Sequence, residues 1–305
     1  MIKCLILSLK NEPFLSDLLK NSELNALISL LDEPSNPVYD KIREKVLVYG
    51  LEAIPYLENA WDNSFNNNIQ QRVEEIIHSI QVADLKHELK NWKEHDRINL
   101  LKGFYLITKF QYPDLNIAVI EEKIEKIKKD IWLELNSNLT ALEKVKVLNH
   151  IIFDVYNFSG NKSNVDSLQN LFVNSLLEVK KGNHLTIGML YIIISQKLGM
   201  PVFGVNLPQH FILAYVDEIQ EESVSAPNEN DVLFYLNPFN KGAVFTQREI
   251  ELFIKHLKLK PLPLYFKPCD NLAIIKRLVE AIIASYNKIG QPEKAQELKS
   301  IAEVL

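Results

Sequence analysis

The chain has 305 residues, of which 47% are hydrophobic and 24% are charged, and its formal net charge is −5. This composition is typical of a globular protein that is long enough to bury a sizeable core and to hold more than one domain. The acidic balance and the lack of a basic stripe argue against a nucleic-acid partner. With only 9 glycines, the sequence also disfavours a Rossmann-type plan.

The cysteine usage and the absence of long apolar runs bear on the compartment. Cys4 and Cys269 lie far apart and form neither a metal-ligand pattern nor a disulfide framework, which fits a reducing environment. The apolar run at the N-terminus is too short for a signal peptide, and no segment approaches the ~18 apolar residues of a membrane span. We therefore expect a cytoplasmic protein without a membrane partner, and we interpret Cys269 as a small core residue.

The first half of the chain, from residue 12 to about 155, is predicted to form a succession of helices. Apolar residues recur there at helical spacing, and the charged run within 117–135 is expected to be a solvated helix face stabilised by pairs four residues apart. The first helices resemble a HEAT-type repeat, and an irregular helical bundle is the alternative. Thr140 and Glu143 have the spacing of a capping box for a helix over 141–154.

The stretch 176–215 is predicted to contain a turn, a buried helix, a second turn and a β-rich segment. Residues 185–198 are apolar except for one lysine, and Gly199 and Pro201 end this helix. His210 lies within the β-rich segment. A nucleophile at a helix N-terminus, with a histidine on the facing sheet as its base, is the layout of papain-like sites. No cysteine is present in this stretch.

Polar residues before the turn have two interpretations. Asn170, Asn174 and Glu178 are spaced four apart, which places them on one face of a predicted helix. This face is either an ordinary polar surface or a hydrogen-bonding wall beside Gly182. His210 has an alternative of its own, because a histidine that enters a strand can be a buried, hydrogen-bonded core group.

The remainder of the chain is predicted to alternate between strands and helices. A polar excursion over 217–231 precedes a strand at 232–236, which Asn237 follows. Thr246, with a glutamate three residues later, is expected to cap the next helix. The tail from 271 to 305 is predicted to form two helices around a turn, with the spacing of a single tetratricopeptide hairpin.

Several of these segments together resemble the transglutaminase-like core of the bacterial SirB-type proteins. The matching segments are F-S-G-N at 158–161, Q-N-L-F-V-N-S-L-L-E-V-K-K-G-N at 169–183, L-Y-I-I-I-S-Q-K-L-G-M-P-V at 190–202, G-V-N-L-P-Q-H-F-I-L at 204–213 and N-P-F-N at 237–240. The resemblance covers about a third of the chain, between about residues 149 and 246. The helical first half and the tetratricopeptide-like tail also suit this family.

The resemblance implies an α+β fold in which a papain-like or transglutaminase-like core packs a helix on a small antiparallel sheet. A mostly helical region, HEAT-like or irregular, precedes this core, and a helical hairpin follows it. We expect a helical N-terminal domain at 1–140, the transglutaminase-like core at 141–268 and the hairpin at 269–305.

The resemblance also assigns candidate site residues. Active transglutaminases use a Cys at the helix start, a His on a strand and an Asp on the next strand. His210 matches the His, Asn237 falls at the Asp, and the Cys position falls within 183–186, where Thr186 matches the Ser or Thr of the SirB-type pattern. His184 stands where that pattern usually has Pro. The residues expected to line the remaining cleft are Gly182, Asn183, His184, Asn206, Asn170 and Asn174.

Three functions are open at this point. The missing thiolate favours a non-catalytic scaffold that binds a ligand or peptide in the remnant cleft. A hydrolase or acyltransferase would use Thr186 as nucleophile, His210 as base and Asn237 as orienting residue, and it requires these three residues to converge in one cleft. A metal site on His184 and His210 would lack a third ligand. We expect no metal or cofactor, and a protein or peptide partner through the cleft or the helical regions.

Overall fold

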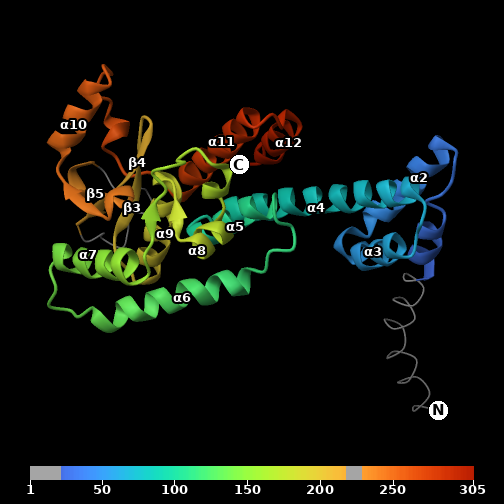
Figure 1. Cartoon of the computed structure of the whole chain (residues 1–305), viewed down its shortest axis with the longest axis horizontal. Helices are drawn as coiled ribbons and strands as arrows, with labels where there is room; N and C mark the ends of the chain where they lie inside the picture. The colour runs from blue at the N-terminus through green and yellow to red at the C-terminus, as the bar shows by residue number, and fades with distance from the viewer. Residues whose placement is uncertain (1–21, 218–228) are drawn as a thin grey trace, which may run out of the picture. The chain divides into compact units, whose positions relative to one another are not determined.

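The computed structural model describes residues 22–217 and 229–305. Cys4 and most of the predicted excursion at 217–231 lie outside these residues. The chain divides into two compact units, 1–87 and 88–305, which are described separately (Figure 1). The domain boundaries that we predict at residues 140 and 268 both fall inside the second unit, so that finer division stays a prediction.

The first unit is helical in its described part. Its elements are a helical segment at 22–29, α2 (Asn36–Val48), the 3₁₀ helix η1 (Gly50–Ala53), α3 (Ile54–Asp62) and the first turns of α4 (Asn67–His95). Leu57 is fully buried, as its helical spacing predicts. Trp61 lies on the same face of α3 as Leu57 by its spacing, but it is 37% exposed and its Nε1 donates a hydrogen bond to Glu74 at 2.9 Å. The buried face of α3 is therefore narrower than the spacing of its apolar residues predicts.

The second unit begins with helices whose buried side chains are mostly apolar. These helices are the last turns of α4, then α5 (Leu100–Lys109), α6 (Ile117–Glu134), α7 (Ala141–Asn149) and the π-helical turn η2 (His150–Val155). The predicted capping box of α7 is confirmed, because Glu143 N donates to Thr140 Oγ1 at 3.4 Å and Thr140 N donates to Glu143 Oε2 at 2.8 Å. The helix predicted over 141–154 therefore exists, with its last part in the wider π-helical form.

A small sheet forms the centre of this unit. Its strands are β3 (Val202–Leu207), β4 (His210–Val216), β5 (Val232–Asn237) and β6 (Ala243–Phe245), which pair antiparallel in this order. A two-residue parallel pair, β1 (Ser159–Gly160) with β2 (Lys181–Gly182), forms a separate sheet. Helices that pack on a small antiparallel sheet confirm the predicted α+β class.

The two faces of the sheet are covered by different helices. Helix α9 (His184–Lys197) packs on β3 and β4, and Gly188 allows this close approach, because a Cβ there would lie 2.7 Å from Phe211. Helix α10 (Gln247–His256) covers the other face, where Ile250 packs in one cluster with Ile212. Since side chains alternate along a strand, His210 lies on the same face as Ile212, toward α10.

The tail forms two packed helices, α11 (Asn271–Lys288) and α12 (Pro292–Ala302). Asp270 caps α11 by accepting from Ala273 N at 2.9 Å, and Gly290 takes a left-handed conformation (φ +75°) in the turn between the helices. None of the helices in the described parts of the chain is both long enough and apolar enough to span a bilayer.

Candidate functional site

The start of α9 is organised by a short cap. Helix α8 (Val173–Val179) ends at Lys180, which is left-handed (φ 58°), and β2 then leads to Asn183. The side chain of Asn183 accepts a hydrogen bond from Thr186 N at 2.9 Å and so caps the helix that His184 begins. Gly182 leaves space for this arrangement, since a Cβ on it would lie 2.6 Å from Thr186 Oγ1.

Thr186 is held as a structural hydroxyl in this arrangement. Its side chain is fully buried, and Oγ1 donates to the carbonyl oxygen of Asn170 at 2.7 Å and lies 3.2 Å from Asn183 Oδ1. A hydroxyl has a single proton to donate, and Asn170 and Asn183 are the acceptors within reach. No described hydrogen bond links Thr186 to His210, so the hydroxyl joins the 3₁₀ helix η3 (Leu168–Leu171) to α9 instead.

The side chain that reaches His210 from the helix start is that of His184. The two imidazole rings lie 5.4 Å apart between centroids at an interplanar angle of 46°. On its other side, His210 meets the edge of Phe253 of α10 at 5.4 Å and 77°. Because residues two apart on a helix point in directions about 200° apart, Thr186 and His184 cannot both face His210. That spacing is the signal in the sequence that singles out one of the two positions.

Both imidazoles are neutral at neutral pH. Burial lowers the pKa of His184 from 6.5 to about 4, and the positive charge of Arg277 and the proximity of His210 add to this effect. Burial and Arg277 also lower the pKa of His210. The Nδ1 atoms of both rings are buried without a hydrogen-bond partner in the structure. The site therefore presents two uncharged rings that can each accept or donate a hydrogen bond.

Arg277 of α11 holds the histidine strand in place. Its guanidinium donates to Asn206 Oδ1 at 3.0 Å, to Leu207 O at 3.1 Å and to His210 O at 2.8 Å. The tail helix is thereby fastened to the turn between β3 and β4, and Asn206 serves this anchor. The sequence gives no local signal for this role of Arg277, which lies 67 residues after His210 in the predicted tail hairpin.

Two hollows border the imidazole pair. One, of about 420 Å³, is lined by residues that include Asn183, His184 and Arg277. The other, of about 290 Å³, is lined by residues that include His210 and Asn237. The side chain of Asn237 accepts from Asn240 N at 3.2 Å and caps a short 3₁₀ helix. His210 and Asn237 therefore share a hollow, whereas Thr186 is among the lining residues of neither.

The predicted polar face before the turn is divided between two elements. Asn170 belongs to η3 and not to α8, which begins at Val173, so Asn170 does not continue the face of Asn174. The Asn170 side chain is 4% exposed, accepts from Asn161 Nδ2 at 3.0 Å and donates to Asn164 O at 2.6 Å. It organises the loop before η3, and the expected helical spacing is wrong at this residue because the chain is extended at Phe172.

Metal and thiol chemistry find little support in the described parts of the chain. No group of three or more His, Cys, Asp or Glu side chains there has the arrangement of a metal site. Burial raises the pKa of the Cys269 thiol to about 12, so this thiol stays protonated at neutral pH. Its backbone N donates to Gly204 O at 2.8 Å, which extends the edge of the sheet.

Comparison with known proteins decides the family. The family model described as transglutaminase-like superfamily matches residues 118–280, more than half of the chain. The chain belongs to the transglutaminase-like superfamily. The matched range of this superfamily member contains α9, the whole sheet and α10, and it ends within α11, beyond Arg277. The roles of Thr186, His210 and Asn237 as a triad stay a prediction.

The curated relatives are distant. A UPF0162 protein of Vibrio cholerae is 23% identical over 188 residues, 61% of this chain and 65% of that protein. A UPF0162 protein of Xylella fastidiosa is 21% identical over 208 residues, 66% of this chain and 70% of that protein. Human F-box only protein 21 is 27% identical over 147 residues, 48% of this chain and 22% of that protein. The chain thus covers about two thirds of the length of the two UPF0162 proteins and about a fifth of the F-box protein. No solved structure gives a significant match.

Proposed function

We propose that this transglutaminase-like protein is non-catalytic and that it binds a peptide or a small polar ligand in the cleft around His184 and His210. The observation that carries the proposal is the group that meets His210. In the triad that the resemblance implies, a cysteine thiolate from the helix start occupies this place, and here it is an imidazole. An imidazole with a pKa of about 4 carries no charge at neutral pH and offers no anionic nucleophile.

The state of Thr186 supports the same proposal. A threonine hydroxyl needs a general base within hydrogen-bond reach to act as a nucleophile, because its own pKa lies far above neutral. Thr186 Oγ1 donates to the Asn170 carbonyl at 2.7 Å, and a carbonyl cannot take the proton away. Moreover, the side chain is 0% exposed, which leaves no room for an acyl group to approach.

The larger hollow supports ligand binding. Its volume of about 420 Å³ lies in the range of small-ligand sites, and its lining brings together Arg277, Lys288, Asp166, Glu280 and Gln209 with the neutral ring of His184. Charges of both signs beside amide and imidazole groups suit a ligand that carries both donors and acceptors, such as a peptide segment. A purely apolar ligand would leave these groups without partners.

A covalent probe tests the non-catalytic part of the proposal. The wild-type chain and Thr186→Ala are incubated with a fluorophosphonate and with an activated acyl ester, and intact mass is measured. We expect no adduct on the wild type and no difference between the two proteins. An adduct that peptide mapping places on Thr186 and that Thr186→Ala removes would establish the hydrolase or acyltransferase alternative and overturn the proposal.

A blocking variant tests the binding part. Ala284 lies in the wall of the larger hollow and is exposed, so Ala284→Trp obstructs the hollow without disturbing the core. Gln296→Trp adds the same side chain at an exposed position of α12 and serves as the matched control. Peptides selected on the wild type from a random displayed library should lose ~10-fold or more in affinity on Ala284→Trp and none on Gln296→Trp. Peptides that bind all three proteins alike would contradict a binding site in this hollow.

A further inference from the structure

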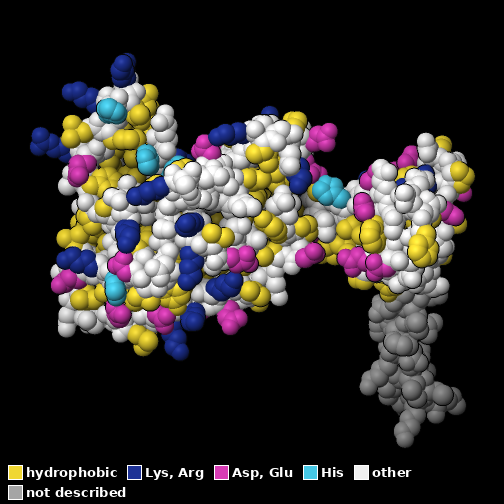
Figure 2. Space-filling view, viewed as in Figure 1, with side chains coloured by type: hydrophobic (Ala, Val, Ile, Leu, Met, Phe, Trp, Pro, Cys, Tyr) yellow, Lys and Arg dark blue, Asp and Glu magenta, His cyan; other side chains and the backbone are white. Residues whose placement is uncertain are grey.

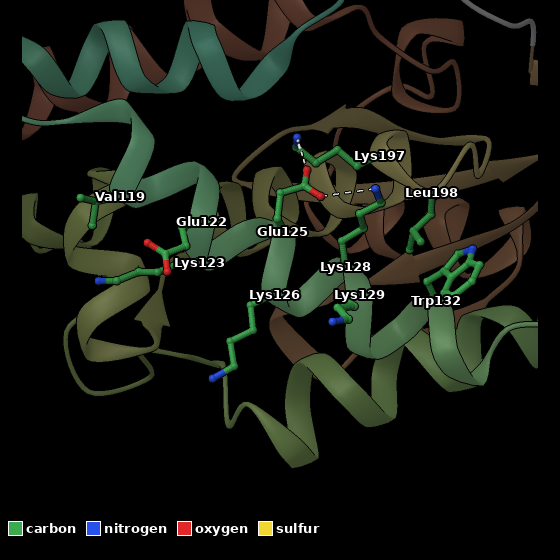
Figure 3. A pocket seen from close by; sticks show the side chains of 10 residues that line it. All are labelled: Val119, Glu122, Lys123, Glu125, Lys126, Lys128, Lys129, Trp132, Lys197 and Leu198. Carbon is green, nitrogen blue, oxygen red and sulfur yellow. Dashed lines mark hydrogen bonds and ion pairs between the residues drawn. The ribbon is translucent and has the colours of Figure 1, made fainter.

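A second surface, at the opposite end of α9 from His184, has the features of a docking groove. It is a hollow of about 890 Å³, larger than either hollow at the histidines. Helix α6 supplies most of its lining, and Lys197 and Leu198 at the end of α9 supply the rest (Figure 3). The groove lies on the solvent side of α6, because Ile120, Ile124 and Ile127 face the core.

The groove is strongly positive for a chain of this composition. Five lysines and two glutamates line it, an excess of three positive charges on a protein with a formal net charge of −5. In the space-filling view, Lys and Arg side chains gather over α6 with acidic side chains among them (Figure 2). Such a local reversal of sign attracts acidic partners and steers their approach.

The ion pairs leave most of this charge unmatched. Lys197 and Lys128 both pair with one carboxylate, that of Glu125, at 2.6 and 3.3 Å. The hydrogen bond from Lys197, reinforced by Lys128, lowers the pKa of Glu125. By contrast, Lys123, Lys126 and Lys129 have no ion pair among the residues that the structure describes. Among the described residues, α6 therefore forms fewer internal ion pairs than its alternating charges predict, and more of its lysine charge remains unpaired.

Apolar side chains lie at the two ends of the row of lysines (Figure 3). Trp132 is 63% exposed and Val119 is 49% exposed, and both line the groove. The indole of Trp132 stands at one end of the row of lysines (Figure 3). Tryptophan is enriched where protein partners bind, because it buries a large apolar area and keeps a polar N–H for the rim.

We propose that this groove docks an acidic segment of a protein partner, with carboxylates on Lys123, Lys126 and Lys129 and an apolar side chain on Trp132. The first and last of these lysines are six helical steps apart, ~9 Å along the helix axis, which matches a few residues of an extended peptide. Glu121, Glu122 and Glu134 flank the row on α6 and would repel the continuous phosphates of a nucleic acid. An acidic peptide can place its carboxylates on the lysines and its neutral residues beside these glutamates.

Binding of a defined peptide tests the proposal. The probe is a fluorescently labelled peptide in which Asp-Phe-Glu-Leu is repeated three times, and the control peptide repeats Asn-Phe-Gln-Leu. Fluorescence anisotropy with the full chain should show binding of the acidic peptide only. Its affinity should fall as salt is raised from about 50 to about 300 mM, because salt screens exposed charges. Equal binding of the neutral peptide would overturn the electrostatic argument.

Matched variants locate the site. We expect the triple variant Lys123→Glu, Lys126→Glu and Lys129→Glu to weaken binding ~10-fold or more and Trp132→Ala to weaken it several-fold. The control triple variant Lys255→Glu, Lys260→Glu and Lys267→Glu changes the net charge equally at exposed positions outside the groove and should bind as the wild type does.

Two outcomes would overturn the proposal. One is equal weakening by both triple variants, which would show a non-specific charge effect. The other is binding of a single-stranded oligonucleotide or of anionic vesicles to the groove more tightly than the acidic peptide. Circular dichroism of each variant must match that of the wild type, and the wild-type result with the two peptides decides the proposal even where a variant fails to fold.

Discussion

The partly buried histidine at the start of α9 should make the stability of the second unit depend on pH. In the folded chain, burial holds the pKa of His184 at about 4, against an ordinary value of 6.5. Between these two values the unfolded chain binds a proton that the folded chain does not. The free energy of unfolding therefore falls as pH falls below the unfolded pKa, and this loss is complete only below the folded pKa. His184 contributes no penalty above about pH 7.5.

The magnitude follows from the two pKa values. At about pH 4.5 the unfolded state gains about 2.5 kcal/mol from protonation of His184 relative to the folded state. Replacement by a group that does not titrate removes this term. We therefore expect the stability difference between the wild type and His184→Gln to shift by about 2.5 kcal/mol, in favour of the variant, from about pH 7.5 to about pH 4.5.

The assay is urea unfolding at both pH values, followed by tryptophan fluorescence. All proteins carry Trp61→Phe, so that the signal comes from the second unit, where Trp92 is 1% exposed. His184→Phe serves as a matched variant, because it keeps a ring beside His210 but cannot titrate. The two variants should differ from each other in stability by the same amount at both pH values. If the free energy of unfolding of the wild type changed with pH by the same amount as that of both variants, the burial of a neutral His184 would be refuted.

Three further predictions concern the groups that build the site. Thr186→Val should lower the free energy of unfolding by about 1–3 kcal/mol in urea titrations, because the buried Asn170 carbonyl loses its donor, whereas Thr186→Ser should keep most of that bond; equal losses would contradict the structural hydroxyl. Gly188→Ala should cost about 1–3 kcal/mol in the same assay, since its Cβ would lie 2.7 Å from Phe211, and a neutral effect would contradict the close packing of α9 on β4. Arg277→Leu should raise the pKa of His184 in an NMR titration, because it removes a nearby positive charge; an unchanged pKa would separate the guanidinium from the histidine site.

Local sequence patterns predict many of the element boundaries, and the family resemblance supplies the overall architecture. The turn before α9, the apolar run of α9 and its end at Gly199, and the capping boxes of α7 and α10 each depend on residues within a few positions of one another. Such short-range rules are strong because backbone hydrogen bonds at helix ends must find partners nearby. Together with the resemblance, they sufficed to place a helix on a small antiparallel sheet.

The details of the site depend on contacts between distant segments, which the sequence pattern does not contain. The hydroxyl of Thr186 is taken by a carbonyl 16 residues earlier, and the backbone of His210 is held by a guanidinium 67 residues later. The choice between His184 and Thr186 as the neighbour of His210 does not depend on a distant contact. Positions two apart on a helix point about 200° apart, and this angle follows from the sequence spacing alone. The match of Thr186 to the family pattern contains no information about this angle.

The most direct test of the site is to place a thiol at each of the two helix positions. His184→Cys and Thr186→Cys are alkylated with iodoacetamide over a range of pH, and peptide mapping separates each site from Cys4 and Cys269. The thiol introduced by His184→Cys should react rapidly, with a pKa lowered by the helix N-terminus and by His210. The thiol introduced by Thr186→Cys should stay protected until the chain unfolds, as the full burial of Thr186 requires. Rapid alkylation at position 186, with protection at 184, would contradict the account.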